Sequence, residues 1–222
     1  MVPDMLYNSN MLKKYLSGNA SPQLIEYLKD YDFRFVDSQD IVSSGISDHA
    51  DVFYCRLGCR DEAEVLAAEP TELAPGYPEE AAFNAACTGR YFIHKTDITS
   101  PRLLAAAKAA DMELIDVRQG YCKCSTVIVD EESIITYDKA IAAPCQAAGM
   151  SVLLVSPGHV KLRGYDTGFI GGASGRCGGE IIFNGDLTAH PDHENIIEFI
   201  KSRGLTCRWF SDYPLTDIGS II

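Results

Sequence analysis

The sequence predicts one α/β domain over residues 1–222, built from similar units of strands and a helix that surround a common axis. Its length of 222 residues suits one large domain, and 46% hydrophobic with 23% charged residues is a globular composition. The order strand, helix, strand, polar loop, strand occurs three times in succession towards the C-terminus. Units of this kind would form a β/α propeller of pseudo-symmetric ββαβ repeats.

The first unit is expected near the N-terminus and is the weakest copy. It has a predicted helix over 21–31, a strand over 33–36 and, after a polar loop, a strand over 51–55. Residues 56–90 follow and contain a predicted helix over 79–87. This segment fits either a long hairpin insertion or the remnant of a fifth unit. Four units are therefore visible in the sequence, and a total of five is favoured.

Three clearer units follow, because apolar runs with strand and helix periodicity alternate regularly. Two of their helices follow an Asp-apolar-Thr lead-in with an early proline, and two end at or just before a glycine, Gly149 or Gly204, as helix termini commonly do. The helices are predicted at 101–110, 139–148 and 191–203. The strands are predicted at 91–94, 112–117, 125–129, 133–136, 151–155, 168–170, 180–183, 206–210 and 218–222.

The polar loops supply the predicted functional site. Each unit's last strand is preceded by a five-residue frame, and the four frames begin at Asp48, Cys124, Asp166 and Asp217. In a propeller, equivalent positions converge at one end of a central channel. Three carboxylates and one thiol would then line one mouth. Because neighbouring carboxylates repel one another, this ring suits a small cationic ligand such as a guanidine or an amine.

Cys124 is the candidate nucleophile, with His159 as the preferred general acid or base and His49 as the second choice. A thiol among carboxylates needs a cationic neighbour or a bound cation to become a thiolate. The alternative is that each aspartate is a turn residue and Cys124 an inert core thiol. The candidate catalytic residues are Cys124, His159 and Asp166, and the candidate ligand-binding residues are Asp48, Asp217, Tyr165, Arg163 and Tyr121.

Two other motifs are interpreted as structural. His190 and His193 have the spacing of a metal-binding pair, but they open a predicted helix and no third ligand is evident. The glycine-rich stretch 168–179 lacks the following helix of a phosphate loop, so it is interpreted as a flexible hairpin that could cover the channel mouth as a lid. No metal site and no cofactor are predicted.

The charge balance and the cysteines indicate where the protein works. A net charge of −12 disfavours nucleic acid and anionic membranes as partners, while a protein partner or a homo-oligomer stays open. The uncharged stretch 140–160 is interrupted by prolines and glycines, so no membrane span is expected. Eight scattered cysteines and an N-terminus without an apolar signal region predict a cytoplasmic protein with free thiols.

The repeats and several short motifs resemble a known family. Units of about 40 to 50 residues in ββαβ order are similar to the pentein fold, the five-bladed β/α propeller of guanidine-modifying enzymes. Gly158-His-Val160 looks like the element around the catalytic histidine of agmatine deiminases, and Gly168–Ser174 looks like a strand end of dimethylarginine dimethylaminohydrolases. Residues 76–86, 119–125 and 166–175 resemble an uncharacterised bacterial family assigned to that fold.

One departure from this family bears on catalysis. Catalytic penteins usually carry the nucleophilic cysteine just before the final strand, whereas residues 215–222 contain no cysteine. Either Cys124 has taken over that role from a pseudo-symmetric position, or the protein binds a ligand without transforming it. The sequence therefore predicts a binding site for a small cationic ligand, with a cysteine-dependent hydrolase or deiminase-like enzyme as the alternative.

Overall fold

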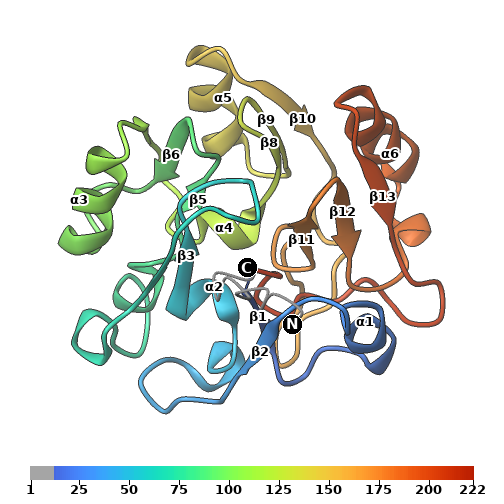
Figure 1. Ribbon diagram of the computed structural model, residues 1–222, viewed down its shortest axis with the longest axis horizontal. Helices are drawn as coiled ribbons and strands as arrows, with labels where there is room; N and C mark the ends of the chain where they lie inside the picture. Colours follow the sequence, from blue (N-terminus) through green and yellow to red (C-terminus); the bar gives the residue numbers. More distant parts are fainter. Residues whose placement is uncertain (1–12) are drawn as a thin grey trace, which may run out of the picture.

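The computed structural model describes residues 13–222, so the N-terminal stretch on which the absence of a signal was judged lies outside the described residues. Within this range the chain forms five small sheets, which are spread around the middle of the molecule (Figure 1). Four helices lie towards its periphery: α1 (Pro22–Tyr27), α3 (Pro101–Ala109), α5 (Lys139–Ala147) and α6 (His193–Ser202). The mixed α/β class predicted from the sequence is confirmed. Within residues 13–222, no helix combines the length and apolar character needed to cross a bilayer.

The first sheet pairs β1 (Lys14–Ser17) in parallel with β2 (Phe33–Val36). The strand predicted at 33–36 is therefore confirmed. The connecting helix α1 (Pro22–Tyr27) is shorter than predicted. It begins at Ser21, whose hydroxyl accepts a hydrogen bond from the Leu24 N–H, and proline occupies the first turn, where no N–H is needed.

The predicted strand over 51–55 is wrong in its first half. Residues Ala50–Phe53 form a single buried helical turn, α2, and only then does β3 (Tyr54–Arg56) begin, which pairs antiparallel with β4 (Val65–Ala67). A tertiary bond holds this turn, because the Asp51 N–H donates to the Gly219 carbonyl at 3.0 Å. The predicted helix over 79–87 is also wrong, since only a short 3₁₀ turn, η3 (Glu79–Ala81), precedes β5 (Ala86–Cys87).

The other three sheets share one design. An antiparallel pair is followed by a helix and by a third strand, which lies parallel to the second. The predicted succession of strand, helix and strand is therefore confirmed in each of the three units, but the closing strands predicted at 168–170 and 218–222 are not formed. The elements are β6 (Tyr91–His94), α3 (Pro101–Ala109) and β7 (Glu113–Asp116); α4 (Cys122–Ser125), β8 (Thr126–Asp130), β9 (Ser133–Thr136), α5 (Lys139–Ala147) and β10 (Ser151–Leu154); and β11 (Ser174–Cys177), β12 (Glu180–Phe183), α6 (His193–Ser202) and β13 (Thr206–Arg208).

The glycine-rich stretch 168–179 is not a lid. Residues 168–170 are not a strand, and the first strand of this sheet is β11, within the glycine-rich stretch itself. A Cβ atom on Gly171 would overlap the Lys123 carbonyl, and one on Gly175 would overlap the Ile221 carbonyl. The glycines therefore allow backbone segments to pack directly against each other.

Five turns meet at the centre of the molecule and are joined by hydrogen bonds. The turns are α2, the segment around Asn84, α4, residues 171–173 and the C-terminal residues 219–221. The donor–acceptor pairs are Asp51 N to Gly219 O, Asn84 Nδ2 to Asp51 O, Lys123 N to Asn84 O, Gly172 N to Cys124 O, and Ser220 N to Gly172 O, at 2.8–3.0 Å. Two further bonds join Ile222 to Tyr15 of β1, although the predicted strand over 218–222 is not formed.

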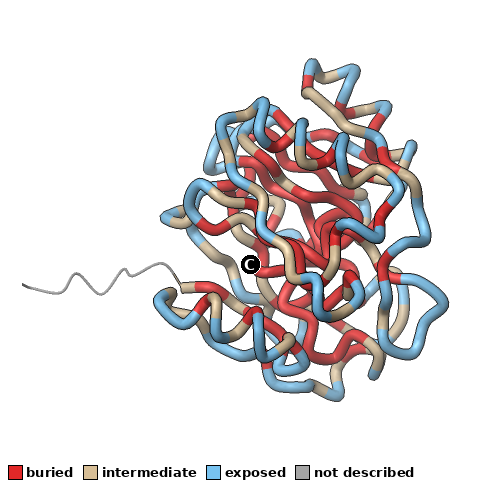
Figure 2. The backbone as a smooth tube through the Cα atoms, turned by 90° about the vertical axis from the view of Figure 1, so that its right-hand side faces the viewer, coloured by how far each residue is buried: buried red, intermediate tan, exposed pale blue. Residues whose placement is uncertain are grey.

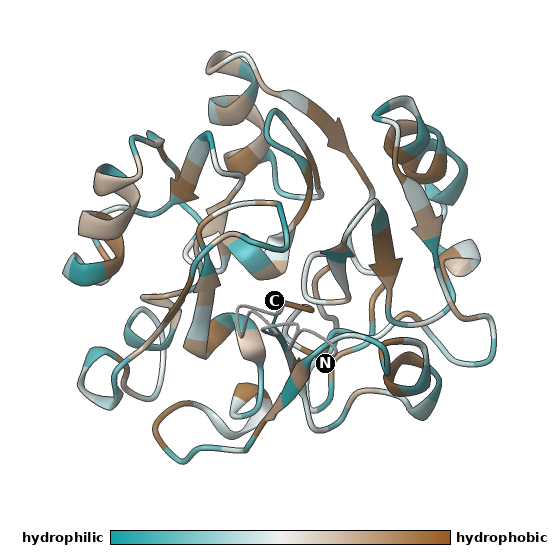
Figure 3. Cartoon of the chain, viewed as in Figure 1, coloured by the Kyte–Doolittle hydropathy of each residue, from teal (hydrophilic) through white to brown (hydrophobic). Residues whose placement is uncertain are grey.

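The core lies between the sheets and the outer helices. Buried residues run through the interior, while exposed ones follow the outer loops (Figure 2). All four residues of β6 and of β9 are buried, and the strands carry most of the hydrophobic colour in Figure 3. Burial on both faces explains why these short strands read as continuous apolar runs in the sequence.

Candidate functional site

A cavity of about 160 Å³ lies beside α2 and α4, on one side of the central turns. A cavity of roughly 150 Å³ accommodates a molecule the size of benzene, so this one has room for a small ligand. Apolar and aromatic side chains form most of its wall, as in many ligand pockets. Its polar groups come from His49, Glu80, Cys124 and Asp217, and its aromatic side chains from Tyr121, Tyr165 and Phe169.

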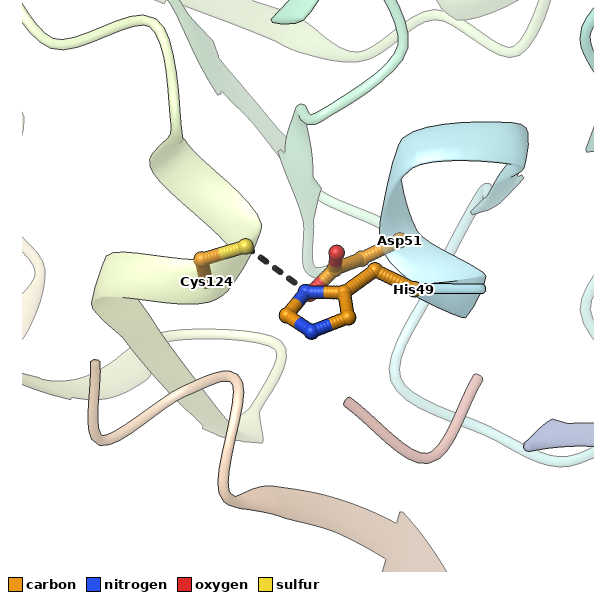
Figure 4. Close-up of side chains that lie close together, drawn as sticks. All are labelled: His49, Asp51 and Cys124. Carbon is orange, nitrogen blue, oxygen red and sulfur yellow. Dashed lines mark hydrogen bonds between the residues drawn. The ribbon is translucent and has the colours of Figure 1, made fainter. Parts of the chain in front are cut away.

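Cys124 lies on the one-turn helix α4 and is 4% exposed. Asn84 holds it from two sides, because its Oδ1 accepts from the Cys124 N–H and its Nδ2 donates to the Cys124 Sγ, both at 3.1 Å. The thiol in turn donates to Asp51 Oδ2 at 3.0 Å (Figure 4). Cys124 is therefore held by a network of polar groups and not by apolar contacts alone.

His49 immediately precedes α2 and directs its imidazole towards the thiol. Figure 4 shows the ring beside Asp51 with one nitrogen on the side of Cys124. Its Nδ1 lies 3.9 Å from Asp217 Oδ1, is buried, and has no hydrogen-bond partner within residues 13–222. A thiol, an imidazole and a carboxylate thus lie next to one another in the cavity wall.

Asp217 is buried and accepts backbone hydrogen bonds from Phe169 and Gly219, each at 2.9 Å. Burial raises the pKa of this carboxyl group to about 6, although His49 and the two hydrogen bonds act in the opposite direction. Room for the carboxylate is provided by Gly172, where a Cβ atom would overlap its oxygens. The glycine-rich stretch therefore contributes to the site as a surface against which Asp217 packs.

Burial raises the pKa of the Cys124 thiol well above its ordinary value, and the nearby Asp51 and Asp217 raise it further. Lys123 lies beside this group, but its Nζ donates to Ser220 Oγ at 2.9 Å, and burial lowers its pKa. The Ser220 hydroxyl donates onward to Asp51 Oδ2. A cation entering the cavity would favour the thiolate, because it would offset the two carboxylates.

Glu80 provides a second carboxylate in the cavity wall. It accepts hydrogen bonds from the Tyr121 hydroxyl at 2.6 Å and from the backbone of Ser43 and Gly76, each at 3.0 Å. Burial alone would raise the pKa of Glu80, but these hydrogen bonds outweigh it and hold the pKa below its ordinary value. The side chain is therefore a fixed acceptor, ionised at neutral pH.

The structure brings some of the predicted residues together and separates others. Cys124, Asp217, Tyr121 and Tyr165 line the cavity. Asp48 and Arg163 line an adjoining cleft of about 630 Å³, where Asp48 accepts hydrogen bonds from Ser17 and Asn19. This cleft shares His49 and Asp217 with the cavity, so the two spaces are neighbours.

The structure does not place Asp166 or His159 in the wall of the cavity or of the adjoining cleft. Asp166 is exposed and lines neither space. The five-residue segment that begins at Asp166 lies too early in the chain to precede the strand directly. Since β11 begins only at residue 174, the residues before it that correspond to Cys124 are the central glycines. His159 is exposed and packs edge-on against His190, with ring centroids 5.2 Å apart.

Sequence reasoning missed Asp51, Asn84 and Glu80. The sequence predicts a strand at Asp51 and a helix at the other two residues, whereas Asp51 lies on the helical turn α2 and only the 3₁₀ turn η3 forms at Glu80. The sequence does contain one signal for this site, a charged residue three positions before a strand. Asp51 precedes β3 in this way, and Lys123 precedes β8. Asn84 occupies a similar place, two residues before β5.

The described residues contain one group of side chains with the spacing of metal ligands. Ligand atoms of His49, Asp51 and Cys124 lie within 4.8 Å of one another. His190, in contrast, uses both ring nitrogens for backbone contacts, with Nε2 at 3.1 Å from Ser156 O and Nδ1 accepting from the Asp192 N–H at 3.1 Å.

No curated protein and no solved structure matches the chain. A family model matches residues 60–222, a range that includes Asn84, Cys124 and Asp217 but begins after His49 and Asp51. That range covers more than half of the chain. The chain therefore belongs to the family of unknown function DUF6873.

Proposed function

We propose that the protein binds a small ligand bearing a guanidinium or amidinium group in the 160 Å³ cavity and hydrolyses it with Cys124 as the nucleophile. The observation that carries this proposal is the meeting of a thiol, an imidazole and two carboxylates in one cavity, from segments far apart in the sequence. A nucleophile, a base and charged groups that orient the substrate are the parts required for covalent catalysis.

The cavity wall is suited to a planar cation. Asp217 and Glu80 supply carboxylates, which can accept charge-assisted hydrogen bonds from the N–H groups of such a cation. Phe169, which stacks on Tyr137 with ring centroids 5.7 Å apart, and Tyr121 supply aromatic faces that attract cations. The negative charge of the chain favours such a ligand over an anionic one.

The reaction proceeds in two steps. The Cys124 sulfur attacks the central carbon of the amidinium group while His49 takes the thiol proton, and the C–N bond then breaks as His49 returns that proton to the leaving amine. A water molecule, deprotonated by His49, attacks the carbon of the S-linked intermediate. The C–S bond breaks, the sulfur recovers a proton, and the net reaction converts a guanidinium and water into a urea and an ammonium ion.

The fold proposed with this function is a five-unit β/α propeller of the pentein type. Five sheets and the hydrogen bonds that join the five central turns support it. In this arrangement each unit contributes its turn to the centre, and the site forms where the turns of α2 and α4 meet the C-terminal segment.

A cationic alkylating agent tests the proposal directly. 2-Chloroacetamidine should alkylate Cys124, forming the S–CH₂ bond and releasing chloride, while the neutral 2-chloroacetamide serves as its matched control. After correction for their rates with free cysteine, we expect the cation to react about tenfold faster or more, the factor that roughly 1.4 kcal/mol of charge stabilisation supplies. Peptide mapping by mass spectrometry identifies the modified thiol.

Methylguanidine should slow this labelling, Cys124→Ala should abolish it, and Cys122→Ala on the same helical turn should leave it unchanged. Equal rates for the two reagents, or a label on another cysteine, would remove the proposal.

Ligand binding without catalysis is the second candidate, and the raised pKa of the buried Cys124 thiol favours it. In that case methylguanidine should still protect the site, and Cys124→Ala should bind it as tightly as the unmodified protein in calorimetry. No guanidine would then yield a urea product.

A further inference from the structure

We propose that His49, Asp51 and Cys124 form a binding site for a zinc-type divalent cation, at the base of the cavity. The three residues come from α2, the residue that precedes it, and α4, so they are brought together only by the fold. The proposal concerns the same thiol as the proposed reaction but does not depend on that reaction.

The donor atoms are close enough to surround one ion. The Cys124 sulfur, a ring nitrogen of His49 and a carboxylate oxygen of Asp51 lie within 4.8 Å of one another. Zinc bonds of about 2.0–2.3 Å in a tetrahedral site place donor atoms roughly 3.3–3.8 Å apart. The Cys124 Sγ and Asp51 Oδ2 are already 3.0 Å apart, so only small rotations of the side chains are needed.

Two atoms left without partners point to the ion independently. His49 Nδ1 and Asp51 Oδ1 are buried, and neither has a hydrogen-bond partner within residues 13–222. Both side chains are more than nine-tenths buried, at 4% and 0% exposed. An unsatisfied buried acceptor costs free energy, and a metal bond to each atom would remove that cost.

The charges around the site also favour a dication. Asp51 and Asp217 lie beside the thiol, while the ammonium group of Lys123 is directed to the Ser220 hydroxyl. Binding of M²⁺ with loss of the thiol proton would give two anionic ligands, Cys124 and Asp51, that balance its charge. A thiolate together with an imidazole selects zinc-like ions over magnesium and calcium.

The neighbouring residues are placed to support such a site. Asn84 Nδ2 donates to the Cys124 sulfur at 3.1 Å, and the Ser220 hydroxyl donates to the Asp51 carboxylate. These two hydrogen bonds fix the orientation of two of the three ligands. Two of the three ligands, His49 and Cys124, line the cavity, where Asp217 Oδ1 lies 3.9 Å from His49 Nδ1. Because His49 and Cys124 also line the cavity, a bound ion would compete there with a cationic ligand.

Cobalt(II) is the probe that tests the site, because Co²⁺ replaces zinc and its bonds to thiolate give charge-transfer absorption in the near ultraviolet. The metal-free full-length protein should bind one Co²⁺ with this band, and Zn²⁺ should displace it stoichiometrically. Cys124→Ala should abolish the band, and His49→Gln and Asp51→Asn should each weaken binding by about a hundredfold or more. Cys122→Ser, a buried thiol on the same turn, is the matched control and should bind normally.

Circular dichroism identifies which variants are folded, and the proposal requires the stated loss in every folded one. A thiolate band that persists in Cys124→Ala, normal Co²⁺ affinity in folded His49→Gln or Asp51→Asn, or no band in the unmodified protein would each overturn it. The experiment uses no guanidine or amidine, so its failure leaves the chloroacetamidine test unaffected. Failure of that test likewise leaves the metal measurement intact.

Discussion

At the scale of single residues, the site depends on positions where a side chain is absent as much as on reactive groups. Gly172 is the clearest case, because its backbone faces the Asp217 carboxylate and a Cβ atom would overlap the carboxylate oxygens. Both oxygens are held by backbone N–H groups, so Asp217 cannot move away without losing hydrogen bonds. The sequence shows a glycine-rich stretch, but only the structure shows that Asp217, 45 residues after Gly172, packs against it.

Replacing Gly172 with alanine should therefore destabilise the protein. We expect the free energy of unfolding to fall by about 1–3 kcal/mol, the usual range for overpacking, because the added methyl group displaces Asp217. Urea denaturation measures the change. Gly179→Ala is the matched control in the same stretch, since its Cβ would meet open space, and its effect should stay within about 0.5 kcal/mol. Equal effects of the two substitutions would contradict this account of Gly172.

At the scale of secondary-structure elements, the sequence predicted well those strands and helices whose pattern is set locally. The strands at 91–94, 133–136 and 180–183 are confirmed to the residue, because they are buried on both faces and bounded by polar turns. The turns α2 and α4 were missed, because tertiary hydrogen bonds hold one helical turn where the residues suit a strand. The candidate site lies on these two turns, and for this reason only part of it could be predicted.

His94, at the end of β6, joins that strand to its neighbours and makes stability depend on pH. Its Nδ1 lies 2.6 Å from the Thr99 hydroxyl and its Nε2 lies 2.8 Å from the Gly120 carbonyl. Burial lowers the pKa of His94 to about 4, against its ordinary value of 6.5. The unfolded chain therefore takes up a proton at a higher pH than the folded protein, so stability present above about pH 6.5 is lost as the pH falls towards 4.

The difference between these pKa values corresponds to roughly 3 kcal/mol of unfolding free energy across this window. Urea denaturation at a series of pH values between 4 and 7 measures the loss. A His94→Gln variant, which keeps a donor and an acceptor but does not titrate, should show a flatter profile. A wild-type profile in His94→Gln would contradict the assignment.

At the scale of the whole molecule, the five sheets are held together by their central turns, and Asn84 links three of these turns. Its Nδ2 donates to the Asp51 carbonyl and to the Cys124 sulfur, its Oδ1 accepts from the Cys124 N–H, and its carbonyl accepts from the Lys123 N–H. The side chain is 0% exposed, so no solvent can replace these bonds. The architecture and the proposed nucleophile thus depend on one amide.

Replacing Asn84 with alanine should therefore affect stability and reactivity together. We expect the free energy of unfolding to fall by about 2–4 kcal/mol, since the change leaves the Cys124 N–H and the Asp51 carbonyl buried without a partner. The freed turn should also expose the thiol, so the neutral reagent 2-chloroacetamide should label Cys124 faster than in the unmodified protein. Asn195→Ala, an exposed position on α6, is the control for both measurements. A variant that loses stability without faster labelling would show that Asn84 holds the sheets together but does not position Cys124.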